Sequence, residues 1–380
     1  MFSPDKVNSG RQPELDIARG LAVLFMIIIH VQLVFANAGV WDTLLADIND
    51  FNGDIPAAPM FMFLLGIGIN YSRKNQPASM AWRGLALLCT AYLLSFVRGF
   101  IPNVIMGFNS ADISYLYKGF NELMIVDILQ FSGLAMIMFA GFNFFKFNKI
   151  AIGITGLVFA LINILLLPVQ TQTLPVSSLA GLFWGSNESS YFPFLTWAFY
   201  PIAGYIFGDY LIRCTDKRKF YLISGVVAAV VFFFGIYLFN FLFSIPTGMN
   251  LETGYYHHIL TDNITFTGGV IFELAILSYL VRYVPGFIKD IAGRWSKNVT
   301  PIYCIHWVII SWLTLAIPGQ SLSMASFIVL TAGIVVGSDM LATIYANWKA
   351  GDGQRHFSST TLILVGALLA TMLVLFLFHK

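Results

Sequence analysis

Arg19 and His30 are the residues whose types and spacing most directly suggest chemistry. They lie eleven residues apart in an apolar stretch that begins at Leu15. In an α-helix, that separation brings two side chains to within ~20° of the same direction and sets them about 16 Å apart along the axis. One stripe would therefore carry a permanent cation near one membrane face and a titratable imidazole deep in the bilayer. Such an imidazole either locks two helices by a buried hydrogen bond or takes part in proton transfer, and Asp16, three residues before Arg19, favours a functional role.

Two acidic residues elsewhere in the apolar sequence are candidate catalytic partners of His30. Asp127 and Glu273 lie in the segments 122–144 and 263–284, which places both near the middle or in the outer half of a bilayer. A carboxylate beside an imidazole fixes its tautomer and stabilises the imidazolium that forms when it accepts a proton. The sequence does not choose between the two acids.

Other polar residues in apolar segments have different interpretations. Asp209 and Asp339 are predicted near the inner face, where pairing with an Arg or Lys of a loop explains them. Gln130 is a candidate to bind the acetyl-CoA thioester, where its side chain or a neighbouring hydroxyl would donate to the developing oxyanion. His306 is expected to be structural, with a place in the lining of a substrate cavity as the alternative.

The composition indicates a membrane protein. Of 380 residues, 58% are hydrophobic and 11% are charged, against about 25% charged in soluble domains. The net charge of +2 and the scattered basic residues give no reason to expect nucleic acid as a partner. The three cysteines lie in or beside apolar segments without a CxxC motif, so neither a disulfide framework nor a metal site is predicted.

About eleven stretches are long and apolar enough to span a bilayer, which takes about 20 residues per helix. We therefore predict an all-α polytopic membrane protein with a single transmembrane domain over residues 1–380, whose first span acts as a signal anchor. The second span contains Gly66 and Gly68, which are expected to allow close packing against a neighbouring helix. The predicted spans are 15–37, 56–72, 82–101, 122–144, 149–168, 191–213, 219–243, 263–284, 299–317, 323–347 and 359–379.

Lysine and arginine predict the orientation of these spans. With Arg19 counted at the inner mouth, 18 of the 21 basic residues fall in or beside alternate connections, starting with the N-terminal one. The other three are Arg98, Lys118 and Lys380. Because cytoplasmic loops carry the excess of Lys and Arg, the N-terminus is predicted in the cytoplasm and the C-terminus outside.

Two predicted outer loops, 41–54 and 252–262, combine aromatic and acidic side chains. That combination can hold the face of a sugar and its hydroxyl groups. It is also typical of a solvated loop beside an interfacial belt of aromatic residues, which is the simpler explanation.

Seven short motifs follow one another along most of the chain. The first helix combines Leu15-Asp16-x-x-Arg19-Gly20 with Met26 and His30. The others are Ala58 to Gly66, Arg83-Gly84-Leu85, Asp127 to Leu134, Phe192-Pro193-Phe194, Tyr200-Pro201-x-x-Gly204 and Pro301 to Trp307. In this order and at this helix count, the chain resembles the heparan-α-glucosaminide N-acetyltransferase-like membrane proteins. Its Arg-x10-His spacing also resembles that of other membrane acyltransferases that modify cell-surface glycans.

The resemblance implies transfer of an acetyl group from cytoplasmic acetyl-CoA, across the membrane domain, to an acceptor on the far side, with His30 as the catalytic histidine. The short N-terminus has no counterpart of the lysosomal enzyme's extra lumenal region. A carbohydrate or amino-sugar acceptor, such as a bacterial-type envelope glycan, is therefore expected, in a bacterial inner membrane. N- and O-acetylation both stay open. The expected partners are acetyl-CoA, this acceptor, the lipid bilayer and, as an option, a second copy of the chain in a homodimer.

The cations of the predicted inner face suit the phosphates of CoA, which arginine holds by paired hydrogen bonds. The pantetheine arm would then follow the stripe from Arg19 and bring the thioester to His30, the general base, with an acetyl-histidine intermediate as the variant. Candidates to bind the nucleotide end are Arg19, Arg73, Lys74, Arg83, Arg294 and Lys297.

The alternative belongs to another class of function. A transporter or flippase of an anionic or lipid-linked solute would use the same intramembrane charges as a relay. Inverted repeats with broken helices would favour it, and none is detectable in the sequence.

Overall fold

The computed structural model describes residues 2–73, 75–171, 174–187, 189–244 and 254–350. Within these ranges the chain is helical and forms no strand, although three isolated β-bridges join distant segments. The predicted all-α class is therefore confirmed. The predicted span 359–379 lies outside the described residues.

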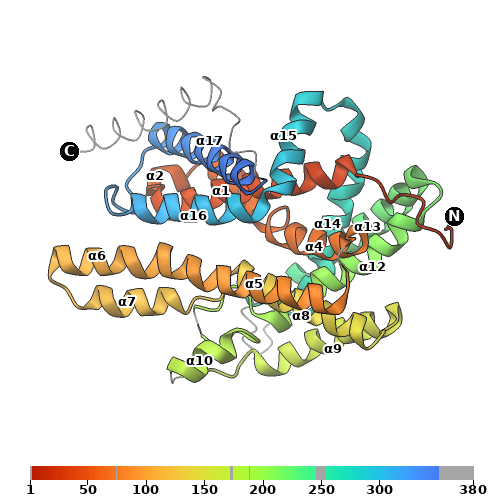
Figure 1. Cartoon of the computed structure of the whole chain (residues 1–380), viewed down its shortest axis with the longest axis horizontal. Coiled ribbons are helices and arrows are strands. Elements are labelled where there is room, and N and C mark those ends of the chain that lie inside the picture. Colours follow the sequence, from red (N-terminus) through yellow and green to blue (C-terminus); the bar gives the residue numbers. More distant parts are fainter. Residues whose placement is uncertain (1, 74, 172–173, 188, 245–253, 351–380) are drawn as a thin grey trace. The chain divides into compact units, whose positions relative to one another are not determined.

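The first of two units comprises Met1–Ala18, Ala58–Ser95 and Phe120–Val284. Its helices pack in pairs, and Figure 1 shows one pair, α5 and α8, side by side. The pairs are α4 (Ala58–Tyr71) with α12 (Phe199–Arg213), α5 (Pro77–Ser95) with α8 (Ile128–Phe144), and α13 (Lys217–Ser244) with α14 (Leu260–Leu280). The unit also contains α9 (Lys149–Leu166), α10 (Leu174–Gly181), α11 (Phe194–Trp197) and the short 3₁₀ helix η2 (Val281–Tyr283).

Glycine residues allow the backbones of α4 and α12 to come into direct contact. A Cβ atom on Gly66 would lie 1.9 Å from the carbonyl oxygen of Pro201, and one on Gly204 would lie 2.0 Å from that of Phe63. The predicted packing role of Gly66 is thus confirmed. The same prediction for Gly68 is wrong, because a Cβ there would meet no atom within 4 Å.

The second unit comprises Arg19–Ala57, Phe96–Gly119 and the chain from Pro285 onward. Here α16 packs against α17 and against the π-helix η1. Its elements are α1 (Pro13–Phe35, which begins in the first unit), α2 (Ala38–Trp41), α3 (Leu44–Asp54), η1 (Phe96–Phe100), α6 (Ile101–Ser110), α7 (Ser114–Leu123, which ends in the first unit), α15 (Gly286–Lys297), α16 (Val299–Leu313) and α17 (Met324–Lys349).

The carboxyl end of α1 is held by the segment that precedes α17. The last carbonyl groups of a helix have no partner within it. Here the backbone N–H of Gln320 donates to Val34 O at 2.9 Å and that of Leu322 donates to Phe35 O at 2.9 Å. The segment therefore fixes the end of the helix that carries His30.

Seven described helical segments are long and apolar enough to cross a membrane, which supports an integral membrane protein. Two more apolar helices, α8 and α16, are shorter. The seven are Pro13–Phe35, Leu44–Tyr71, Pro77–Ser110, Lys149–Leu166, Lys217–Leu238, Leu260–Tyr283 and Met324–Lys349.

Several predicted boundaries differ from the structure, and three of them have a clear description in the local structure. The predicted loop 41–54 is largely helical, because Thr43 caps α3 by accepting the Ala46 N–H at 3.3 Å. The predicted span 82–101 continues through η1 to Ser110, since Pro102 falls in the first turn of α6, where a missing N–H is tolerated. The predicted span 191–213 is broken into α11 and α12.

Candidate functional site

His30 and His306 are joined by a hydrogen bond in the second unit. His30 Nδ1 on α1 lies 2.9 Å from His306 Nε2 on α16. The two rings are nearly parallel, at 7°, and their centroids are 5.2 Å apart. His306 is fully buried, whereas His30 is partly exposed. The imidazole predicted to do chemistry is thus accessible, and its partner is sealed in the protein.

Two aromatic side chains pack against this pair, and an arginine packs against one of them. The Trp307 ring lies 4.2 Å from the His30 ring, and Tyr303 packs edge-on against His306 at 5.3 Å. The guanidinium carbon of Arg98 lies 4.4 Å from the centre of the Trp307 ring, a cation–π distance. Arg98 is only 7% exposed, so the protein holds a buried positive charge next to the His30 cluster.

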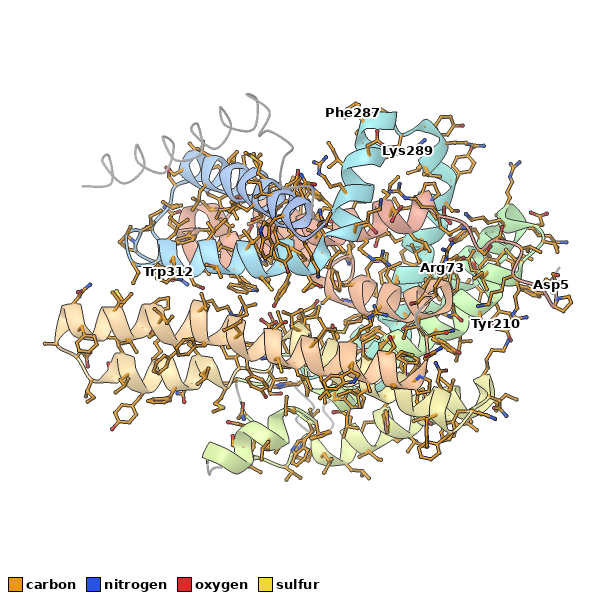
Figure 2. The ribbon with its side chains drawn as sticks, viewed as in Figure 1. Asp5, Arg73, Tyr210, Phe287, Lys289 and Trp312 are labelled. Carbon is orange, nitrogen blue, oxygen red and sulfur yellow. The ribbon has the colours of Figure 1, made fainter. Side chains whose placement is uncertain are left out.

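The π-helix η1 places Arg98 at this cluster. A π-turn widens a helix locally, and such turns are frequent at functional sites. The indole N–H of Trp312, which Figure 2 labels on α16, donates to the carbonyl oxygen of Val97 at 3.1 Å. This bond ties η1 to α16 one residue from Arg98.

Helix α3 packs against α1 at Ile29 and Gln32, close to His30 in the sequence. The amide of Asn49 donates to the Gln32 side chain at 2.8 Å, and both residues are buried. A Cβ atom on Gly53 would lie 2.8 Å from Ile29 Cγ1, so α3 and α1 touch directly beside His30. Close packing at Gly53 therefore holds α3 against the residue next to His30 in the sequence.

Two of the predicted CoA-binding arginines belong to the same unit as His30. Arg19 Nη1 donates to Ser296 Oγ at 2.7 Å. Arg294 forms two hydrogen bonds with the Asp339 carboxylate, at 3.0 and 2.5 Å, which raises the pKa of Arg294 above its usual value. The predicted pairing of Asp339 with a basic residue is confirmed.

The other two predicted arginines belong to the first unit, and both are exposed. Arg73 follows α4 and is labelled in Figure 2, and Arg83 lies in α5. Lys74 lies outside the described residues, and Lys297 is exposed at the end of α15. The predicted pairing of Asp209 is confirmed by Lys149 at 2.5 Å and Arg213 at 3.1 Å.

Asp127 and Gln130 form a capping box in the first unit. Helix α8 begins only at Ile128, so Asp127 is its N-cap and does not lie inside the helix as predicted. The Asp127 carboxylate accepts the Ile128 N–H at 2.7 Å, while Gln130 accepts the Asp127 N–H at 3.2 Å and donates to Ile125 O at 3.0 Å. Both side chains stabilise the start of α8, and a role beside His30 stays a prediction.

Glu273 is partly buried on α14, also in the first unit. Its proposed support of His30 likewise stays a prediction. In the second unit, His306 occupies the partner position for which the sequence suggested a carboxylate.

In the described part of the predicted outer loop 252–262, His258 is buried in the protein. His258 is 1% exposed, its Nε2 lies 2.9 Å from the Tyr200 hydroxyl, and its Nδ1 lies 2.9 Å from Tyr255 O. Burial lowers the pKa of His258 to about 4. This histidine anchors the loop and is not exposed to a sugar.

Sequence reasoning missed three members of the His30 cluster. His306 was expected to be structural, with a place in the lining of a substrate cavity as the alternative. Trp307 was noted only within a motif, and Arg98 was assigned to the outer connections. Its place in a connection is wrong, because the helix does not end near residue 101 and the side chain is buried, whereas its side of the membrane stays a prediction. Among the described residues, no group of three or more His, Cys, Asp and Glu side chains is placed to hold a metal ion.

Comparison with known proteins identifies one family. The family model described as "Heparan-alpha-glucosaminide N-acetyltransferase, catalytic" matches residues 11–246. The match includes Arg19, His30 and Arg98, and it ends before α16, which supplies His306 and Trp307. No curated protein matches the chain.

Proposed function

Because the chain belongs to the heparan-alpha-glucosaminide N-acetyltransferase catalytic family, we propose that it transfers an acetyl group from acetyl-CoA to a carbohydrate or amino-sugar acceptor. The observation that carries this proposal is the partly exposed His30 ring, held by His306 and Trp307 next to a buried arginine. An accessible base and a fixed positive charge are two groups that accelerate acyl transfer from a thioester.

In the proposed reaction, a hydroxyl or amino group of the acceptor attacks the thioester carbonyl while His30 accepts its proton. The carbonyl oxygen becomes negative in the tetrahedral intermediate. The carbon–sulfur bond then breaks, and the proton on His30 passes to the departing thiolate to give free CoA. The acetylated acceptor and CoA are the products, and His30 returns to its neutral form.

Arg98 is the residue that we assign to the negative oxygen. Its guanidinium shares the Trp307 ring with His30 and is buried, where a charge acts more strongly than in water. Gln130, the earlier candidate, is engaged in the capping box of α8. Asp127 and Glu273 are kept as candidates for a supporting carboxylate.

The nucleotide end of CoA is proposed to bind at basic residues. Arg19 lies on the His30 helix about 16 Å away along its axis, a distance that the extended pantetheine arm can bridge. Arg294, although paired with Asp339, lies in the same unit. Arg73 and Arg83 of the first unit, both exposed, are the further candidates.

Topology completes the proposal. We infer eleven spans in a single acyltransferase domain, an N-terminus in the cytoplasm and a C-terminus outside, in a bacterial inner membrane. The distribution of basic residues supports this orientation. Acetyl-CoA then enters from the cytoplasm, and an envelope glycan or other amino sugar enters from outside.

The first experiment measures free thiol released from acetyl-CoA by the purified protein with a panel of amino sugars and glycans. We expect acceptor-dependent release by the wild-type protein and by the control variant His257→Gln, which changes a histidine of the first unit. Release should be lost in His30→Gln. A protein that binds and moves an anionic solute but releases no thiol would instead be a transporter.

The second experiment tests the two entry routes in sealed vesicles of known orientation. Labelled acetyl-CoA is placed on the side of the N-terminus, and the acceptor is placed on one side or the other. Labelled product should appear only when the acceptor is on the opposite side. If labelled product forms only when the acceptor is on the same side as acetyl-CoA, transfer across the membrane is refuted.

A further inference from the structure

We propose that His306 is the positioning residue that fixes the tautomer of His30 and leaves His30 Nε2 as the atom that accepts the proton. This inference rests on the proposed function, because it assigns a specific atom to the base. It follows from two hydrogen bonds that run in series from the α16 backbone to His30, and from a third contact, the ring packing that holds His30 in place.

The first contact determines the protonation of His306. Its Nδ1 lies 3.2 Å from the carbonyl oxygen of Ile302. A carbonyl oxygen only accepts hydrogen bonds, so Nδ1 must carry a hydrogen. In a neutral imidazole the other nitrogen then has no hydrogen and offers a lone pair. His306 is fully buried, where an additional charge would be costly.

The second contact determines which nitrogen of His30 carries the hydrogen. His306 Nε2, as an acceptor, lies 2.9 Å from His30 Nδ1. Nδ1 of His30 must therefore carry the hydrogen and donate it. This leaves the lone pair of His30 on Nε2, the nitrogen on the far side of the ring from His306.

Ring geometry supports a true hydrogen bond. Two rings stacked face to face would keep their atoms at van der Waals separation, about 3.5 Å. The nitrogen–nitrogen distance is shorter, at 2.9 Å, while the planes differ by only 7° and the centroids are 5.2 Å apart. The rings therefore meet nearly edge to edge, with the hydrogen bond close to both planes.

The third contact keeps His30 in this orientation. Trp307 packs against the His30 ring, and Tyr303 packs against the His306 ring. The charged group that packs against this cluster is Arg98, over Trp307. A second cation on His306 is disfavoured by this like charge and by burial, so His306 stays the acceptor as His30 gains and loses its proton.

The test compares two amides at position 306 that differ by one methylene group. In His306→Gln, the side-chain oxygen reaches the former position of Nε2 and can accept from His30. In His306→Asn, the shorter amide can reach Ile302 O but not His30. We expect His306→Gln to keep the acetyl-transfer kcat within about tenfold of wild type, and His306→Asn to lose about 100-fold or more, with KM for acetyl-CoA unchanged in both.

A second measurement reads the tautomer directly and does not depend on activity. In protein labelled with ¹⁵N-histidine, the His30 resonances are identified by their absence from His30→Gln. We expect a protonated Nδ1 and an unprotonated Nε2 in wild type and in His306→Gln, and a mixture in His306→Asn.

Equal kcat values in the Gln and Asn variants, or an unprotonated Nδ1 in wild type, would overturn the assignment. The two proposals can fail separately. If the wild-type protein transfers no acetyl group but the resonances are as expected, the tautomer assignment stands and the acetyltransferase proposal falls.

Discussion

Replacing Gly53 with alanine tests whether the close contact of α3 with α1 sets the position of His30. The new Cβ would lie 2.8 Å from Ile29 Cγ1 and 2.9 Å from Ile29 Cβ. Ordinary contact begins at 3.4 Å, so the helices must separate by 0.6 Å at this point. Isoleucine is branched at Cβ and cannot turn away, so the shift passes to the α1 backbone one residue before His30.

The size of the effect follows from that displacement. A misplacement of about 1 Å at a reacting group can cost roughly 10²-fold in rate, so about 0.6 Å should lower the kcat of Gly53→Ala about tenfold. Overpacking costs about 1–3 kcal/mol, and alanine returns about 0.5–1 kcal/mol of helix stability. The net loss of folding stability should therefore lie between about 0 and 2.5 kcal/mol.

The assay measures kcat by thiol release, KM for acetyl-CoA and the unfolding temperature in the same detergent. Gly39→Ala in α2 is the matched control, because its Cβ would meet its nearest atom, Asn37 Oδ1, at 3.5 Å. It should keep wild-type kcat. In the double variant Gly53→Ala/Ile29→Ala, part of the lost rate should return, since the Cγ contacts are removed while the Cβ contact remains. A Gly53→Ala protein with unchanged kcat would refute the link between this contact and His30.

Three further predictions concern the base, the donor site and the loop anchor. His30→Ala should fold normally, because the side chain is only partly buried, and lose ~10²–10⁴-fold in acetyl transfer; retention of more than about a tenth of the rate would exclude His30 as the base. Arg19→Gln and Arg83→Gln should each weaken CoA binding in titration calorimetry more than they change the acceptor's apparent affinity, and unchanged CoA affinity in both would argue against a nucleotide site there. Burial lowers the pKa of His258 to about 4, whereas the histidine of the unfolded chain takes up a proton at about pH 6.5. The free energy of unfolding should therefore fall by about 3 kcal/mol in total as the pH falls from about 6.5 to about 4. Unfolding measured across this range should show that slope in wild type and lose it in His258→Gln.

Hydropathy and charge along the sequence predicted much of the fold, because a bilayer constrains which residues can lie inside it. A membrane-spanning segment needs a long apolar helix, so the helical regions could be located from the runs of apolar residues in the sequence. An isolated carboxylate in such a helix needs a partner, so the pairing of Asp339 and Asp209 with basic residues was predictable and is confirmed. The Asp127-x-x-Gln130 spacing before an apolar run is also a capping-box pattern. It could have placed Asp127 at the start of α8 instead of inside it.

The composition of the His30 cluster was not predictable by the same reasoning. A lone arginine near a predicted helix end is assigned to a loop by the positive-inside rule. Arg98 instead lies within a helix, which continues through a π-turn and past Pro102, a proline tolerated in the first turn of α6. Trp307, which is distant in the sequence, packs against the buried Arg98 side chain. Carboxylates were the predicted partners of His30, since these commonly orient a catalytic imidazole. Orientation requires only a fixed hydrogen-bond acceptor, and a neutral imidazole whose other nitrogen is committed to a backbone carbonyl supplies one. A neutral partner also adds no carboxylate beside the buried guanidinium of Arg98, which agrees with the proposed role of Arg98 at the oxygen that becomes negative during transfer.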